Sequence, residues 1–267
     1  RIIYHELQGF NLAEIGAHQM QSLWVRGGFP ASFLARNEPA SVTWRKSFIR
    51  TFLERDLPQL GIRIPAETLR RFWTMLAHYH GQVWNTHEFA RAFGVSAHIV
   101  RQYLDILSHA LVLRQLQPWH ENISKRQVKS PKVYIIDTGL LHTLLGLDTH
   151  TQLTTHPKVG ASWEGFVINE VLATLNVAPE DAYFWGTHGG AELDLLVMQH
   201  GKRLGFECKH TRAPKMTSSI HSALHDLQLD HLWVVHTGEH TFPLHERVTA
   251  IPLHAVASLL PNRVAAL

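Results

Sequence analysis

Residues 190–209, which read GAELDLLVMQHGKRLGFECK, decide the fold of the second half of this chain. Two strand-like runs lie on either side of Gly201, the largely apolar Ala191–Met198 and the more polar Arg203–His210. Two strand-like runs separated by a short turn that contains glycine are typical of a β-hairpin. The stretch therefore predicts two neighbouring antiparallel strands.

Charged side chains lie near the start of the first predicted strand and near the end of the second. Successive side chains of a strand point to opposite faces, so Glu192 and Asp194 share one side of the first strand. Glu207 and Lys209 share one side of the second strand, and Cys208 points the other way, into apolar packing. Neighbouring strands can bring the two pairs together. Crowded carboxylates repel one another unless a proton or a cation intervenes. A hard divalent ion is the usual answer, and Mg²⁺ suits oxygen ligands better than zinc does.

Further elements flank the hairpin in a regular order. Apolar residues recur at helical spacing over Ser162–Leu175, a segment that carries Glu164 near its start. A strand over Tyr183–Trp185 precedes the hairpin, and a helix over Ser218–Leu229 and a strand over His231–His236 follow it. The predicted order is α-β-β-β-α-β.

Residues 66–136 predict a winged helix. The expected elements are a helix over Glu67–Tyr79, a short helix over Thr86–Phe93 capped by Asn85 and ended by Gly94, a third helix capped by Ser96, and strands over Leu111–Leu116 and Lys132–Ile136. Two short helices joined by a small turn and followed by strands are typical of this motif.

The winged helix supplies candidate DNA contacts. If the third helix enters the major groove, its residues nearest the bases are His98, Arg101 and Gln102. The basic connection between the two strands would contact phosphates through Lys125, Arg126, Lys129 and Lys132. The alternative is a module that packs against a neighbouring domain or binds a protein, and the sequence leaves the two equally open.

Residues 1–65 are predicted to be mostly helical. The longest helix is expected over Ser41–Leu60, with Ser41 as its N-cap and a solvated basic face. That face carries Arg45, Lys46, Arg50 and Arg55. Arg26 is either part of a lid that abuts an upstream domain or an ordinary loop arginine.

Composition limits the class of protein. The chain has 267 residues, 45% of them apolar, with a net charge of +3, 21 His and one Cys. One cysteine excludes a disulfide scaffold and a cysteine-rich zinc site, and the histidines show no zinc-ligand spacing. Charged or polar residues interrupt every apolar run, so we expect a cytoplasmic protein without membrane spans. Because it begins with Arg1 and not Met, we expect the chain to be a fragment or a processed product.

The acids and the lysine, with Glu164 on the preceding helix, resemble the signature of the PD-(D/E)XK nuclease superfamily. Nearly the whole chain, moreover, resembles the C-terminal portion of a prokaryotic AAA-type ATPase family with a conserved domain of unknown function. The stretches that carry this resemblance are LWVRGGFP (23–30), FLERDL (52–57), NISKRQVKSPKVYIIDTGLL (122–141), GASWEGFVINE (160–170), GAELDL (190–195) and FECK (206–209).

The resemblance implies an α/β chain, α+β overall, in three parts. A helical, lid-like remnant over residues 1–65 precedes a winged-helix domain over 66–146, and a restriction-endonuclease-like domain over 147–267 holds a central mixed sheet flanked by helices. A nucleotide-binding core belongs upstream in that family. No Gly-x-x-x-x-Gly-Lys-Ser/Thr loop occurs in this sequence, so we expect it neither to bind nor to hydrolyse ATP.

The resemblance also implies roles for the site residues. Asp194 and Glu207 would be the principal ligands of Mg²⁺ or Mn²⁺, with Glu164 as a third. Lys209 would orient the attacking water or stabilise charge on the phosphate. Glu192 is an additional acid, and Leu193 stands where the signature has proline.

Three functions follow as hypotheses. The first is a Mg²⁺-dependent DNA endonuclease module joined to an upstream ATPase. The second is a catalytically inactive module that binds DNA or a protein partner and regulates the ATPase. The third is a winged-helix transcription regulator, which leaves the acidic cluster after residue 160 unexplained. The sequence leaves the oligomeric state open.

Overall fold

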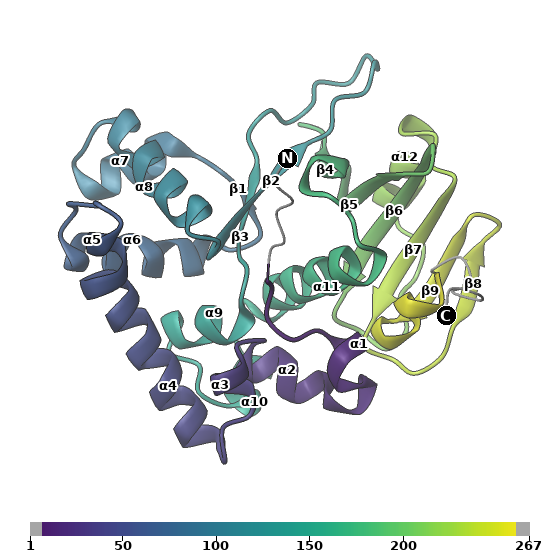
Figure 1. The fold of residues 1–267 in the computed structure, drawn as a ribbon. Helices are drawn as coiled ribbons and strands as arrows, with labels where there is room; N and C mark the ends of the chain where they lie inside the picture. Colours follow the sequence, from purple (N-terminus) through teal and green to yellow (C-terminus); the bar gives the residue numbers. More distant parts are fainter. Residues whose placement is uncertain (1–6, 260–267) are drawn as a thin grey trace, which may run out of the picture.

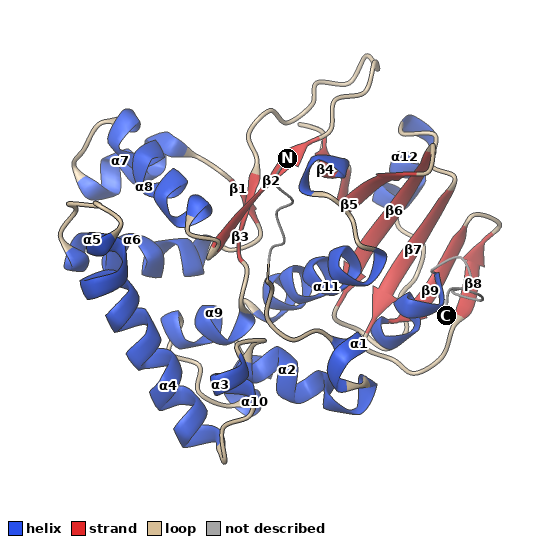
Figure 2. Ribbon diagram, in the orientation of Figure 1, coloured by secondary structure: helices blue, strands red, loops and turns tan. Residues whose placement is uncertain are grey.

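A computed structural model describes residues 7–259, so that Arg1 lies outside the described range. The first part of the chain is helical, as predicted (Figures 1 and 2). Its elements are α1 (Leu12–Ile15), η1 (Ala17–Gln19), α2 (Met20–Arg26), α3 (Pro30–Phe33), α4 (Glu38–Thr51), the π-helix η2 (Phe52–Asp56) and α5 (Leu57–Gln59).

Helix α4 begins earlier than predicted. The Asn37 side chain accepts a hydrogen bond from the Ala40 amide at 2.9 Å and so satisfies a donor that has no partner within the helix. Ser41 is buried inside the helix, so its prediction as the N-cap was wrong. The helix also does not continue unchanged to Leu60, because it passes into the π-helix at Phe52.

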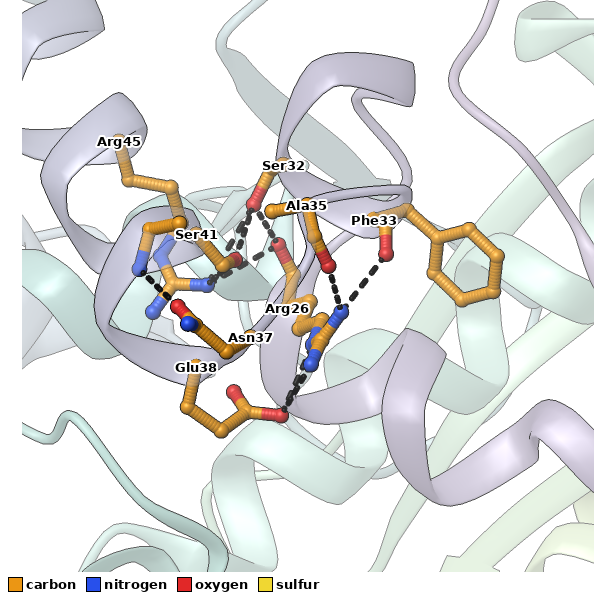
Figure 3. Close-up of polar contacts among 9 residues, drawn as sticks. Arg26, Ser32, Phe33, Ala35, Asn37, Glu38, Ser41 and Arg45 are labelled. Carbon is orange, nitrogen blue, oxygen red and sulfur yellow. Dashed lines mark hydrogen bonds and ion pairs between the residues drawn. The ribbon is translucent and has the colours of Figure 1, made fainter.

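The buried position of Arg45 differs from the predicted basic face (Figure 3). Its side chain is 0% exposed, and its Nη1 donates to Ser41 Oγ at 2.8 Å. Its Nε donates to Thr143 Oγ1, also at 2.8 Å, on helix α9 (Thr138–Leu144). Burial lowers the pKa of Arg45. Arg45 therefore joins α4 to α9, whereas the other three basic residues of that face, Lys46, Arg50 and Arg55, are exposed as predicted.

Arg26 is held inside the helical part of the chain (Figure 3). Its Nε donates to Glu38 Oε1 at 2.8 Å, and its Nη1 donates to the carbonyl oxygens of Phe33 and Ala35. These bonds link the end of α2 to α3 and α4. They give Arg26 a structural role within these helices.

The middle of the chain follows the predicted order of elements, with one added strand. It contains α6 (Ala66–Tyr79), β1 (Gln82–Val83), α7 (Thr86–Phe93), α8 (Ala97–His109), β2 (Leu113–Pro118) and β3 (Lys132–Ile135). Asn85 caps α7, Gly94 ends it in the left-handed region, and Ser96 caps α8, which confirms these local predictions. Strand β3 pairs antiparallel with both β1 and β2.

The last part of the chain contains most of the strands (Figure 2). After α9 come α10 (His150–Thr154), α11 (Val159–Leu175), η3 (Pro179–Asp181), β4 (Ala182–Gly186), β5 (Glu192–Gln199), β6 (Lys202–Lys209), α12 (Ser218–Asp226), β7 (His231–His236), β8 (Phe242–His245), β9 (Val248–Pro252) and η4 (Leu253–Leu259). The α-β-β-β-α-β order is present, and β8 and β9 extend it. Within residues 7–259 no helix is both long and apolar enough to cross a bilayer.

The strands form one mixed sheet of nine in the order β1-β3-β2-β4-β5-β6-β7-β9-β8. Strand β5 runs antiparallel to both of its neighbours, β4 and β6, whereas β6, β7 and β9 run parallel. Strand β2 pairs parallel to β4 through Gln117 and Pro118, and this pairing joins the middle of the chain to its last part. The molecule is thus a mixed α/β structure, with a helical region followed by this sheet.

Helices α11 and α12 cover opposite faces of the sheet. Side chains alternate along a strand, and the neighbours Phe184 and Trp185 accordingly belong to different buried clusters. Phe184 packs in the cluster that contains α11, and Trp185 in the cluster that contains α12. Trp24 of α2 also packs in the α11 cluster, so buried contacts cross the predicted domain boundaries.

Candidate functional site

The β5–β6 hairpin positions two of the predicted site residues. Gln199 pairs with Lys202, and the two loop residues between them, His200 and Gly201, both have positive φ. Positive φ at both positions is the geometry that a two-residue hairpin turn requires. Further along the ladder Leu195 lies opposite Phe206, so Asp194 and Glu207 occupy the next positions on neighbouring strands.

A bulge in β5 alters the direction of Asp194. On the β4 side Trp185 pairs with Leu193 and Tyr183 with Leu196, so β5 has one residue more than β4 in this interval. Such bulges re-aim a side chain and are frequent beside active sites. The Asp194 Oδ2 atom accepts the Cys208 amide at 2.8 Å, and the residue is 8% exposed. Asp194 is therefore tied to the end of the β5–β6 ladder.

Glu207 and Lys209 form an ion pair at the end of β6, as their spacing predicts. The Lys209 Nζ lies 2.7 Å from Glu207 Oε1, and 39% of the Lys209 side chain is exposed. Glu207 is buried, and its Oε2 has no hydrogen-bond partner within residues 7–259. Burial, together with the nearby charge of Asp194, raises the pKa of Glu207. The site thus contains one buried carboxylate oxygen that a cation would satisfy.

Glu164 reaches the same region from α11. Its Oε1 accepts hydrogen bonds from the Tyr134 hydroxyl and from Lys132 Nζ, the latter at 2.9 Å. Burial and the charge of Asp194 raise the pKa of Glu164. The structure therefore brings Glu164 close to Asp194, as predicted. Two donors from β3 already bond to one oxygen of the Glu164 carboxylate, Oε1.

Lys132 is the unexpected member of this cluster. Its Nζ lies 3.6 Å from Asp194 Oδ1 and also forms ion pairs with Glu164 and Glu192. Only 4% of its side chain is exposed. Burial alone would lower the pKa of this lysine, but Tyr134 and the three carboxylates together raise it well above its ordinary value. The sequence prediction that Lys132 contacts DNA phosphates disagrees with this arrangement, because the ammonium is enclosed by acids.

A local signal for this contact is present in the sequence. Lys132 and Tyr134 alternate along a strand whose four residues are all buried, so both side chains point to one face. A lysine at a fully buried position requires acidic partners. The partners themselves lie on α11 and β5, far along the chain, and no local pattern identifies them.

The other predicted DNA contacts are exposed. His98, Arg101 and Gln102 lie on the exposed side of α8, where Gln102 Nε2 is 3.2 Å from His98 Nε2. Lys125, Arg126 and Lys129 lie in the loop between β2 and β3, which extends beyond the strands in Figure 1. Lys125 also pairs with Asp226 at 2.6 Å, so this loop is anchored to the end of α12.

The oxygen donors partly fit the implied metal. Asp194 and Glu207 offer hard carboxylate ligands of the kind that Mg²⁺ and Mn²⁺ prefer, and one Glu207 oxygen lacks a partner. In the described part of the chain, however, no three His, Cys, Asp or Glu side chains converge as a metal site. Glu164 Oε1 accepts Lys132 Nζ, so this carboxylate is paired with an ammonium in the structure.

Comparison with known proteins gives a family but no activity. Uncharacterized proteins of Mycobacterium tuberculosis and Mycobacterium bovis are each 53% identical to the chain over 252 residues. The aligned region is 94% of this chain and 57% of each relative, so the chain spans little more than half the length of these curated relatives. No solved structure matches the chain.

Two families match consecutive parts of the chain. Residues 159–256, which contain Glu164, Asp194 and Glu207, match the family described as Domain of unknown function (DUF4143). Residues 17–151, which contain Lys132, match the family described as Domain of unknown function (DUF8612). Since this second match covers half of the sequence, the chain belongs to the DUF8612 family.

Proposed function

We propose that this chain is the non-ATPase portion of a larger ATPase and carries a divalent-metal-dependent phosphodiester hydrolase that acts on DNA. One observation carries the proposal. Asp194, Glu207 and Lys209 gather where β5 and β6 end, and a buried oxygen of Glu207 has no partner within the described residues. The order of elements around them is that of the PD-(D/E)XK nucleases, which the sequence resembles.

In this proposal Asp194 and Glu207 hold Mg²⁺ or Mn²⁺. The ion would polarise a phosphodiester and lower the pKa of a bound water. Lys209 is partly exposed at the edge of the cluster, where its ammonium can orient the attacking water or stabilise charge that develops on the phosphate. Glu164 could join them as a third ligand through its Oε2, because Lys132 and Tyr134 both bond to its Oε1.

The α6–β3 region is proposed to be a winged helix that binds the DNA. Its three helices and its small antiparallel sheet follow one another in the order of that motif. The exposed residues His98, Arg101 and Gln102 on α8 are placed to read bases, and Lys125, Arg126 and Lys129 to contact phosphates. An Arg101→Ala variant should bind duplex DNA more weakly, as measured by fluorescence anisotropy. An unchanged affinity of this variant for DNA would show that Arg101 of α8 does not contact the duplex.

Cleavage of supercoiled plasmid DNA by the full chain tests the proposal. With Mg²⁺ or Mn²⁺, the wild type should nick the plasmid, and Asp194→Asn or Lys209→Met should reduce the rate by about a hundredfold or more. Glu246→Gln, at an exposed turn residue, is the matched control and should cleave at the wild-type rate. Equal nicking by the wild type and Asp194→Asn would indicate a contaminating nuclease and contradict the proposal.

A second function is favoured by the enclosure of Lys132. Its ammonium already neutralises the acids in the way a metal would, which suits a nuclease-like module that binds without cleaving. That module would bind DNA or a protein partner and regulate an ATPase core elsewhere in the same protein. It predicts no cleavage with any divalent metal, and DNA affinity that falls steeply as salt rises.

The larger protein and its setting are part of the proposal. The relatives extend well beyond the region that this chain matches, which leaves room for an ATPase core. The proposal includes a cytoplasmic location for the protein. ATP binding by the full-length protein, and not by this chain, would support the assignment.

A further inference from the structure

Lys132 is a tethered cation within the carboxylate cluster. It enters from β3, in the part of the chain that matches DUF8612, whereas Glu164, Glu192 and Asp194 lie in the part that matches DUF4143. The side chain also lies over the Phe184 ring, with its Nζ 5.7 Å from the ring centroid. One segment of the chain therefore supplies the positive charge that balances the acids of another.

The backbone around Lys132 is fixed, so only the side chain is free to leave. Lys132 lies opposite Leu116 on β2 and Val83 on β1, in register on both edges of β3. A lysine side chain has four carbons between its backbone and its charge, and rotation about these bonds carries the ammonium away without a change in the strand. A second arrangement, in which the Lys132 ammonium leaves the carboxylates, is part of the proposal that follows.

The carboxylate of Asp194 faces Lys132 in the structure and holds the metal ion in the proposed function. Glu164 and Asp194 accept Lys132, while Asp194 and Glu207 are the pair suited to a divalent ion, so Asp194 is common to both sets. Two cations beside one buried carboxylate repel each other. Lys132 is only 4% exposed, so water screens this repulsion little, whereas the Lys209 ammonium beside Glu207 is 39% exposed and its charge is screened more. Occupancy by the ammonium and occupancy by a metal therefore oppose one another.

We propose that Lys132 and a divalent metal ion compete for the Asp194 carboxylate, so that the site binds Mg²⁺ or Mn²⁺ tightly only when Lys132 moves out. This inference rests on the proposed function for the identity of the metal ligands. It makes Lys132 a built-in inhibitor of metal loading, held by contacts between the two family segments.

Calorimetric titration of Mn²⁺ into the full chain tests the competition. Lys132→Met should lower the Kd for Mn²⁺ by about tenfold or more relative to the wild type. Lys202→Met, which removes an exposed lysine at the start of β6, is the matched control and should leave the Kd unchanged. Adding Asp194→Asn to Lys132→Met should abolish the gain. A Kd for Lys132→Met equal to that of the wild type, or a gain that survives Asp194→Asn, would overturn the inference.

A second pair of variants covers the case in which Lys132→Met does not fold. The double variant Lys132→Met/Glu164→Gln removes one of the uncompensated charges, and its Kd is compared with that of Glu164→Gln alone. The same fall in Kd is expected, and no fall overturns the inference.

Plasmid cleavage is measured separately. Tighter Mn²⁺ binding by Lys132→Met without cleavage would reject the nuclease but retain the competition. Cleavage by the wild type, with the same Kd for Mn²⁺ in Lys132→Met, would retain the nuclease but reject the competition.

Discussion

At the scale of single residues, burial sets the protonation of several acids. Glu170 on α11 is 5% exposed, and its Oε2 accepts the Leu12 amide at 2.9 Å. Burial raises the pKa of Glu170 from its ordinary value of 4.5 to about 7. A folded-state pKa above the unfolded one favours the protonated form, so stability from this group is full below pH 4.5 and is lost as pH rises through about 7.

A Glu170→Gln variant should therefore gain stability relative to the wild type as pH rises. The glutamine keeps an acceptor for Leu12 but never ionises, so the difference in free energy of unfolding should grow between pH 5 and pH 8 by up to about 3 kcal/mol. Urea denaturation at several pH values measures this difference. Glu239→Gln, at an exposed position, should show no such trend. A difference for Glu170→Gln that does not change with pH would contradict the account.

At the scale of elements, α11 packs closely against the end of α6. A Cβ atom on Gly165 would lie 2.4 Å from His80 Nε2. The His80 ring is buried, and its Nδ1 accepts the Ile135 amide at 3.0 Å, so it has little freedom to move aside. Gly165 is required here because the two elements approach too closely for a side chain.

Gly165→Ala should accordingly lower the free energy of unfolding by about 1–3 kcal/mol. Gly160→Ala in the same helix is the matched control, because a Cβ there meets nothing within 4 Å. Alanine is the better helix former, so the control should be neutral or more stable by about 0.5–1 kcal/mol. Chemical denaturation measures both variants. Equal effects of the two substitutions would show that helix propensity, and not packing, decides the outcome.

Elements were predictable from the sequence where their signals are local. Asn85, Gly94 and Ser96 set the ends of α7 and α8, and the residues around Gly201 set the hairpin. Strands β8 and β9 were missed, and the start of α4 was misplaced because Asn37 takes the capping role that we assigned to Ser41. Sequence periodicity finds such elements only when no competing cap or tertiary contact intervenes.

The candidate site was predictable in part for the same reason. Alternation along two adjoining strands places Asp194, Glu207 and Lys209 near one another, and the ion pair of Glu207 with Lys209 agrees with it. The position of Lys132 depends on pairing between strands and helices far apart in the chain. Such contacts follow from tertiary structure, so the sequence placed Lys132 at the start of a predicted strand but did not identify its acidic partners.

At the scale of the whole molecule, the two family segments share buried surface. Trp24 on α2 packs against Trp163 and Phe166 on α11, and its Nε1 donates to Ser162 Oγ at 3.0 Å. Trp24→Ala should therefore lower the free energy of unfolding by about 3–5 kcal/mol. It should also speed amide exchange in α11, which belongs to the other segment. Trp44→Ala, at a partly exposed tryptophan, is the control, and unchanged exchange in α11 would show that the segments unfold separately.

The central claim is that Asp194 and Glu207 together hold a divalent cation. Calorimetric titration of Mn²⁺ into Lys132→Met and into Lys132→Met/Asp194→Asn/Glu207→Gln tests it most directly, because the competing ammonium is absent from both. The account predicts saturable binding of the ion by the first protein and none by the second. Equal heats from the two proteins, or no binding by either, would contradict it.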